Sequence, residues 1–240
     1  MTITHALLVA AIIFAAGLTQ GLTGFGSALV AMPLLTNLIH VRVAASLMSM
    51  TSFILQITIL LRYRQHLEWR AVIRLLVGSW VAVPLGVYGL RLLNEGIVTA
   101  ILGLVIVGYG LYALFTPRLP RIRDVRWGYL FGFASGLLSG AYNASGPPVV
   151  IYGTARRWGP DEFKGNLQGF FMLNNLAVIL SHAVAGDMTP MVWQHALVAF
   201  PAVILGGLAG LSLDRYINPA TFRRIVLWAL IVLGVRLIVV

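Results

Sequence analysis

Two short runs of small and polar residues interrupt an otherwise apolar chain: 23-TGFGS-27 and 142-YNASGPP-148. Glycine, serine and asparagine are weak helix formers, so we expect each run to break a helix. A helix that restarts after such a break presents unpaired N–H groups and a partial positive charge, and both suit an anion. The chemistry expected of these runs is therefore anion binding.

Each run supplies candidate ligands for that anion. We expect the half-helices to start near Ser27 and near Gly146–Pro147, where the missing N–H of a proline is harmless. Ser27 and Ser145 can cap the helices or offer hydroxyls, and the glycines allow close backbone approach. Two amides of a later span, Asn174 and Asn175, either complete the site or form interhelical hydrogen bonds. The predicted substrate-binding set is Thr23, Gly24, Phe25, Gly26, Ser27, Tyr142, Asn143, Ala144, Ser145, Gly146, Pro147, Asn174 and Asn175, with Gln20 and Gln168 as weaker candidates.

The composition indicates a membrane protein. Of the 240 residues 59% are hydrophobic and 10% are charged, whereas a soluble domain carries about 25% charged residues. The net charge of +10 does not indicate nucleic-acid binding, because no long soluble segment exists to carry it. With no cysteine, disulfides and cysteine-based metal sites are excluded. The start of the chain lacks a basic region and a cleavage site, so we expect a first membrane segment there and not a removed signal peptide.

Charge-poor runs predict how the chain meets the bilayer. A helix rises about 1.5 Å per residue and the hydrocarbon core is about 30 Å thick, so roughly 20 apolar residues make one crossing. Two runs are too long for one helix and contain the broken motifs, and we interpret these as helical hairpins at 5–39 and 127–158. Six single crossings are predicted at 43–61, 71–90, 96–115, 165–186, 190–213 and 219–239.

The two halves of the chain resemble each other in sequence. Gly17 and Gly21 align with Gly136 and Gly140 at an offset of 119, and later segments align at offsets of 120 and 121. We therefore predict a two-fold internal repeat of 1–116 and 127–240, joined by a basic cytoplasmic linker at 117–126. Each repeat would consist of one broken hairpin and three transmembrane helices.

The distribution of basic residues favours inverted repeats. If both long runs are hairpins, fourteen of the 17 basic residues lie inside and only Arg42, Arg91 and Arg236 lie outside. If both runs cross the membrane, the split is nine to eight. Cytoplasmic loops are enriched in lysine and arginine, so the first topology is expected, with both termini outside.

The paired motifs resemble those of the TauE/SafE family of membrane permeases. The matching segments are 21-GLTGFGSALVAMPLL-35 and 136-GLLSGAYNASGPPVVIY-152, and the likeness in length and repeat covers essentially the whole chain. The resemblance implies a transporter of small sulfur-containing anions, such as sulfite, sulfoacetate and other organosulfonates, often outward. Asn143 and Ser145 depart from the family's usual pattern, because they stand where glycines are common.

Other candidate chemistry is sparse. All seven acidic residues fall in loops or at span ends, so no buried carboxylate proton relay is expected. For His182 and Asp187, an interfacial pair is favoured over a proton relay. The histidines show no metal-ligand spacing, and neither a metal nor a cofactor is predicted. Arg156, Arg157 and Lys164 set the topology or draw anions toward the inner side.

Taken together, the sequence predicts an all-α polytopic protein of two inverted repeats in the inner (plasma) membrane of a bacterium. Its predicted function is secondary transport of a small anion by alternating access, and not catalysis. An anion channel built on the same motifs and a non-transporting scaffold subunit remain the alternatives. The expected partners are the small anion, the lipid bilayer and, as an option, further copies of the chain, with no nucleic acid.

Overall fold

The described part of the chain is all-helical. The computed structural model describes residues 3–115, 119–213, 216 and 219–239, and no strand occurs among them. Within these ranges, six helices are long and apolar enough to cross a membrane. Both findings confirm the predicted all-α polytopic membrane protein. Part of the predicted linker, with Arg118, and Arg215 beyond α9 lie outside the described residues.

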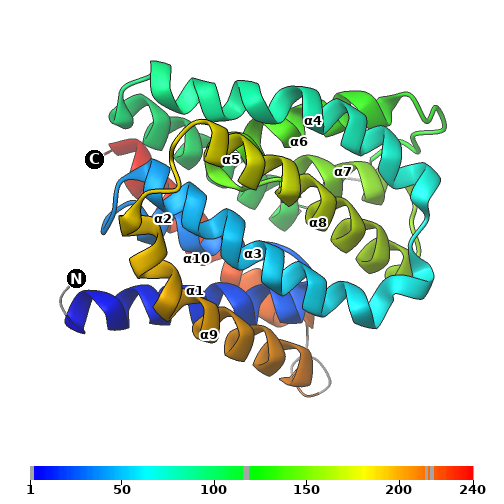
Figure 1. Ribbon diagram of the computed structural model, residues 1–240. Coiled ribbons are helices and arrows are strands. Elements are labelled where there is room, and N and C mark those ends of the chain that lie inside the picture. Colours follow the sequence, from blue (N-terminus) through cyan, green and yellow to red (C-terminus); the bar gives the residue numbers. More distant parts are fainter. Residues whose placement is uncertain (1–2, 116–118, 214–215, 217–218, 240) are drawn as a thin grey trace.

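Ten α-helices and one 3₁₀ turn make up these ranges (Figure 1). The first half contains α1 (Ile3–Thr23), α2 (Ser27–Leu35), α3 (Val41–Tyr63), the 3₁₀ turn η1 (Arg64–His66), α4 (Trp69–Leu92) and α5 (Glu95–Phe115). The second half contains α6 (Trp127–Tyr142), α7 (Gly146–Arg156), α8 (Pro160–Val184), α9 (Pro190–Leu213) and α10 (Pro219–Val239).

The structure differs in detail from the predicted spans. Helix α8 begins at Pro160, ahead of the expected residue 165, because Glu162 accepts the Gly159 N–H at 3.2 Å and caps its first turn. The six candidate spans include α1, which we expected as one arm of a hairpin. Helix α10 is not among them, since it carries three arginines within 21 residues.

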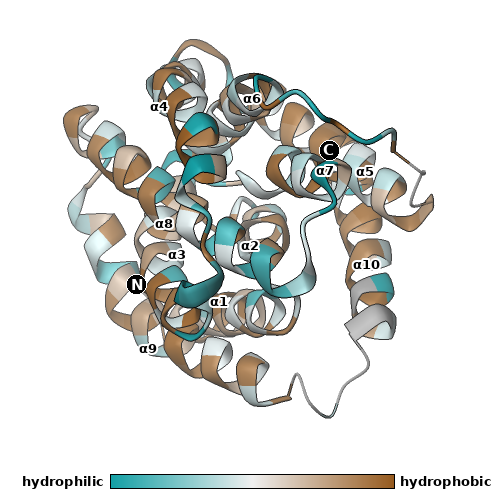
Figure 2. Ribbon diagram, turned by 90° about the vertical axis from the view of Figure 1, so that its right-hand side faces the viewer, coloured by the Kyte–Doolittle hydropathy of each residue, from teal (hydrophilic) through white to brown (hydrophobic). Residues whose placement is uncertain are grey.

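The helices pack in a few close pairs. Helix α1 lies along α9, α4 lies along α6, α3 lies along α8 and α5 lies along α10. The short helices α2 and α7 turn back against α1 and α6, respectively. Helix α1 begins and α10 ends at the same end of the molecule (Figure 1). Viewed along the helices, α4, α5, α9 and α10 surround α2 and show large hydrophobic areas (Figure 2).

Glycines bring three of these pairs into backbone contact, α4 with α6, α1 with α9 and α5 with α10. A Cβ atom added at Gly132 of α6 would lie 2.0 Å from the Leu75 carbonyl oxygen of α4, and one at Gly140 would lie 2.2 Å from that of Val83. A Cβ at Gly21 of α1 would lie 2.6 Å from the Gly207 carbonyl oxygen of α9, and one at Gly103 of α5 would lie 2.5 Å from the Gly234 carbonyl oxygen of α10. Such small-residue seams are typical of membrane helices, whose association depends on close packing.

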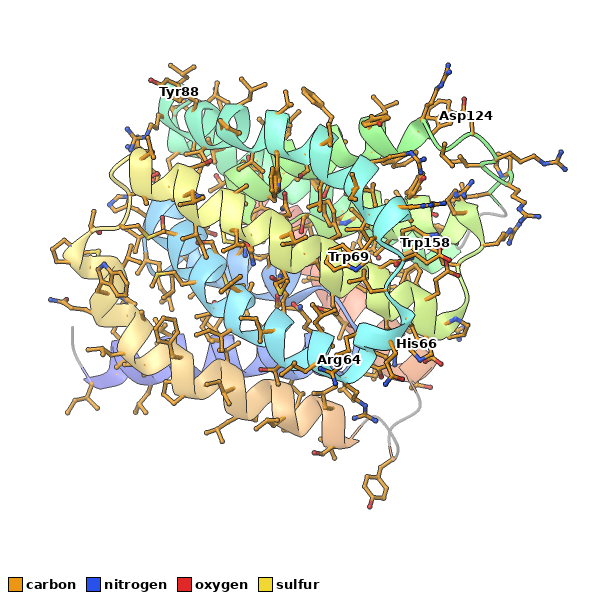
Figure 3. All side chains as sticks on the ribbon, turned by 45° about the vertical axis from the view of Figure 1, so that its right-hand side comes forward. Arg64, His66, Trp69, Tyr88, Asp124 and Trp158 are labelled. Carbon is orange, nitrogen blue, oxygen red and sulfur yellow. The ribbon has the colours of Figure 1, made fainter. Side chains whose placement is uncertain are left out.

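Charged residues concentrate at the two ends of the helices. His66 and Asp124 lie toward one end of the molecule and Tyr88 lies toward the other (Figure 3). At the end where α1 begins, Arg91 donates to Asp187 at 2.8 Å, and His182 contacts the same carboxylate at 2.9 Å. Burial alone would raise the pKa of Asp187, but the hydrogen bonds from His182 and Arg91 outweigh it and lower that pKa. His182 and Asp187 thus form the sequence-predicted pair, and the ion pair of Asp187 with Arg91 fastens α4 to the loop after α8.

Replacing Gly132 by alanine should destabilise the protein by about 1–3 kcal/mol, because the new methyl group would force α4 away from α6. Thermal unfolding of the purified protein in detergent measures the change. Gly89→Ala is the matched control on α4, since nothing lies within 4 Å of its added Cβ. Equal melting temperatures for the two variants would contradict the close approach of these helices.

Candidate functional site

Both sequence-predicted helix breaks are present, and each contains residues with left-handed backbone angles. Between α1 and α2, Gly24 has φ 83° and Gly26 has φ 99°. Between α6 and α7, Asn143 has φ 53°, and asparagine is among the few non-glycine residues that adopt such angles readily. Helix α2 begins at Ser27 and α7 at Gly146, which are the expected positions.

The two breaks lie against each other near a small cavity. A Cβ atom added at Gly146 would lie 3.5 Å from the Phe25 ring, so the two tips are in contact across the repeat. The cavity has a volume of about 20 Å³, which is room for about one water molecule. Its lining comes from α1, both tips, α3 and α8, through Gln20, Gly26, Ser27, Ala28, Leu29, Ser52, Gln56, Asn143, Ala144, Ser145, Gly146 and Phe171.

The two helix ends at this cavity differ in their backbone donors. In α2 the Val30 N–H bonds to the Gly26 carbonyl at 3.1 Å, so the N–H groups before it have no carbonyl partner within the helix. In α7, Pro147 and Pro148 carry no N–H, so fewer backbone donors remain at that end. Neither end has a side-chain cap, so the expected capping role of Ser27 and Ser145 is not seen.

Neutral side chains add donors to the cavity. The Ser27 hydroxyl donates to the Gln20 side-chain oxygen, while Nε2 of Gln20 is buried and has no partner among the described residues. Gln20 is 2% exposed. Nδ2 of Asn143 donates to the Ser52 hydroxyl at 3.1 Å, which leaves the hydrogen of Ser52 able to donate in turn. Among the described residues, no acidic or basic side chain lines the cavity.

Several predicted site residues build the tips without lining the cavity. The Thr23 hydroxyl donates to the Phe25 carbonyl at 2.6 Å and closes the first turn. The Gly24 carbonyl accepts from Nε2 of Gln168. The Tyr142 hydroxyl donates to a carbonyl of α5 at 2.7 Å. Pro147 is buried in the first turn of α7.

The two asparagines of α8 are not among the residues that line the cavity. Asn174 accepts from the Ser79 hydroxyl at 2.6 Å and donates to the Ser139 hydroxyl at 2.8 Å, which links α8 to α4 and α6. Asn175 donates to Gln56 at 2.9 Å, and Gln56 lines the cavity. Asn174 therefore forms interhelical hydrogen bonds, which was one of the two roles predicted for it. Asn175 bonds to Gln56, a residue of the cavity wall.

Sequence reasoning missed part of the lining. Ser52 was not predicted, although it stands four residues before Gln56 on one helix face of an apolar span, and this spacing could have identified it. Ala28 and Leu29 line the cavity from the start of α2, and Phe171 lines it from α8. These three carry no chemical signature in the sequence.

The chain is similar in sequence to a known family of membrane proteins. The profile of the family described as "Sulfite exporter TauE/SafE" matches residues 9–237. A relative from Cupriavidus necator, named "Probable sulfite/organosulfonate exporter TauE", is 30% identical over 225 residues. That alignment covers 91% of this chain and 88% of the relative. No solved structure matches the chain significantly.

Replacing Gly26 by alanine should cost about 1–2 kcal/mol, because its backbone angle disfavours any Cβ even though the nearest side-chain atom is 3.9 Å away. Gly146→Ala at the facing tip is the matched control, with ordinary contact at 3.5 Å and no positive φ. Melting temperatures in detergent compare the two variants. A larger loss of melting temperature in Gly146→Ala than in Gly26→Ala would show that Gly26 does not have a positive φ angle.

Proposed function

Because this chain belongs to the sulfite exporter TauE/SafE family and is a membrane transporter, we propose that it carries a small sulfur-containing anion outward across the membrane. Sulfite, sulfoacetate and other organosulfonates form the proposed substrate class. One observation carries the proposal. Among the described residues, the cavity between the two helix breaks offers hydrogen-bond donors, including Nε2 of Gln20, which has no partner there, and no acidic side chain.

The chemistry of the cavity suits an anion that must also be released. Sulfur oxyanions accept hydrogen bonds through every oxygen, and the helix N-termini of α2 and α7 direct partial positive charge at the cavity. Neutral donors attract an anion without the tight pairing that an arginine would give. The proposed ligands are the backbone N–H groups at Ser27 and Gly146 together with the side chains of Gln20, Ser52 and Ser145.

We propose that the halves 1–116 and 127–240 are inverted repeats. The helix pairing supports this, because the repeat equates α1, α3, α4 and α5 with α6, α8, α9 and α10, respectively. The contact of α1 with α9 then becomes the contact of α6 with α4, and both are observed. The pairs α3 with α8 and α5 with α10 map onto themselves, as expected for an axis that passes between them.

The size of the cavity supports alternating access. A cavity of about 20 Å³ cannot contain an anion of four or more heavy atoms unless the tips move apart. Binding and movement are therefore coupled in the proposed cycle, in which the site opens to each side in turn. An inside-negative potential drives a monoanion outward with about 2.3 kcal/mol per 100 mV, so export requires no coupling ion.

The proposed topology in the bacterial inner membrane predicts opposite labelling of two single cysteines, since the chain has none of its own. Ile3→Cys should react with a membrane-impermeant maleimide added to intact cells, because this end is proposed to face outward. Arg123→Cys should react only after the cells are permeabilised. Labelling of Arg123→Cys in intact cells, with Ile3→Cys protected, would overturn the orientation.

Anion binding at the tips predicts that sulfite raises the melting temperature of the purified protein. In Gln20→Met, the sulfite concentration needed for the same stabilisation should rise by about tenfold or more, because one hydrogen-bond donor to the charged ligand is lost. Ser52→Ala should weaken it as well. Ser49→Ala is the control, since Ser49 lies on α3 one turn away and donates to the Ser46 carbonyl at 2.7 Å. Unchanged sulfite stabilisation in Gln20→Met and Ser52→Ala would refute the proposed site.

A further inference from the structure

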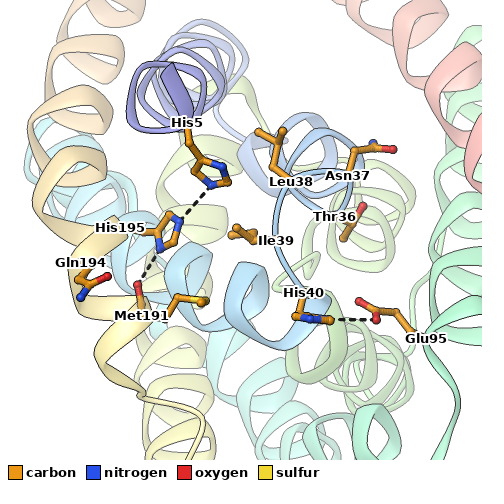
Figure 4. A pocket seen from close by; sticks show the side chains of 10 residues that line it. All are labelled: His5, Thr36, Asn37, Leu38, Ile39, His40, Glu95, Met191, Gln194 and His195. Carbon is orange, nitrogen blue, oxygen red and sulfur yellow. Dashed lines mark hydrogen bonds and ion pairs between the residues drawn. The ribbon is translucent and has the colours of Figure 1, made fainter. Parts of the chain in front are cut away.

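A further cavity lies away from the helix breaks, at the end of the molecule where α1 begins. Its volume is about 560 Å³, and the α2–α3 loop, α1, α9 and the start of α5 form its walls. Three histidines line it, His5, His40 and His195, together with Glu95 (Figure 4). The proposed anion transport uses none of these side chains.

Two of these histidines converge across the contact of α1 with α9. Nε2 of His5 and Nε2 of His195 are 3.3 Å apart. Nδ1 of His195 lies 2.7 Å from the Met191 carbonyl oxygen, which can only accept a hydrogen bond. Nδ1 of His195 therefore carries the proton, and its Nε2 presents a lone pair toward His5.

We propose that His5 and His195 together bind a transition-metal dication such as Zn²⁺ through their Nε2 atoms. Two imidazole nitrogens bound to one tetrahedral zinc at about 2.05 Å lie about 3.3 Å apart, and the observed separation is 3.3 Å. The Met191 carbonyl holds His195 in the manner of the outer partners that orient metal-bound histidines. Binding through Nε2 requires the neutral tautomer of His5 that carries its proton on Nδ1.

Water completes the coordination in this site. Among the described residues, no group of three or more histidine, aspartate, glutamate or cysteine side chains could hold a metal ion. The two histidines are the protein ligands, and the adjoining cavity admits water to the remaining positions. Imidazole ligands favour zinc, cobalt, nickel and copper over magnesium and calcium, which prefer oxygen.

The electrostatics of the cavity suit a cation. In the part of the chain that the structure describes, no lysine or arginine lines it, and Glu95 contributes a carboxylate on the far side, paired with His40 at 3.1 Å (Figure 4). Thr36 and Asn37 place the C-terminal end of α2 at the cavity, and this end of a helix carries partial negative charge. A bound metal would join α1 to α9 beyond the glycine seam that already holds them together.

Zinc titration of the full chain in detergent, purified without a histidine tag, tests the site. ZnCl₂ should raise the melting temperature in a saturable way, whereas MgCl₂ should not. His5→Ala and His195→Ala should each abolish the zinc effect. His40→Ala is the matched control, because His40 lines the same cavity but pairs with Glu95, and it should keep the full effect. Co²⁺ should give the visible absorption of a tetrahedral site in the parent and in His40→Ala only.

His5→Ala decides the outcome, because His5 is only half buried and its loss leaves the core intact, whereas His195 is buried. The proposal is overturned if zinc does not stabilise the parent protein. It is equally overturned if His5→Ala keeps the zinc effect or if His40→Ala loses it. None of these results depends on which anion the protein carries.

Discussion

Broken backbone at membrane depth is the constraint on which this structure depends. Lipid cannot satisfy free N–H and C=O groups, so an interrupted helix must be enclosed by protein or face water. Here Gln168 donates to the Gly24 carbonyl of the first break, and Ser135 donates to the Ser145 carbonyl of the second at 2.7 Å. The carbonyls are thus satisfied within the protein, and the N–H groups at the starts of α2 and α7 are left for the cavity. The glycine seams of α1 with α9 and α4 with α6 allow the enclosing helices to come this close.

The two helix breaks present hydrogen-bond donors to the cavity through different groups. The first uses backbone donors at Ser27 and its neighbours, with Gln20 beside them. The second starts with consecutive prolines, which pre-set the helical backbone but remove N–H groups. Asn143 and Ser145 stand at this poorer end, and both line the cavity. Their polarity compensates in our account for the missing backbone donors.

The sequence predicts local breaks better than it predicts which distant side chains meet. The starts of α2 at Ser27 and α7 at Gly146 could be predicted, because glycine, asparagine and proline act on their own backbone. The opposite holds for Ser52, whose role depends on an asparagine 91 residues away. The pairing of His5 with His195 spans 190 residues and follows only from the packing of α1 on α9. Hydropathy also placed the start of α8 too late, since the charged cap around Glu162 lies outside the apolar run.

The central claim is that an anion binds between the starts of α2 and α7. A crystal structure of the protein with selenite, a heavier analogue of sulfite, tests it most directly. The anomalous signal of selenium identifies the position of the ion independently of the protein coordinates. The account predicts one selenium peak between Ser27 and Gly146, within hydrogen-bond reach of Gln20, with the tips further apart than they are here. A selenium peak confined to the cavity of His5 and His195, or none at the tips with selenite in excess, would contradict it.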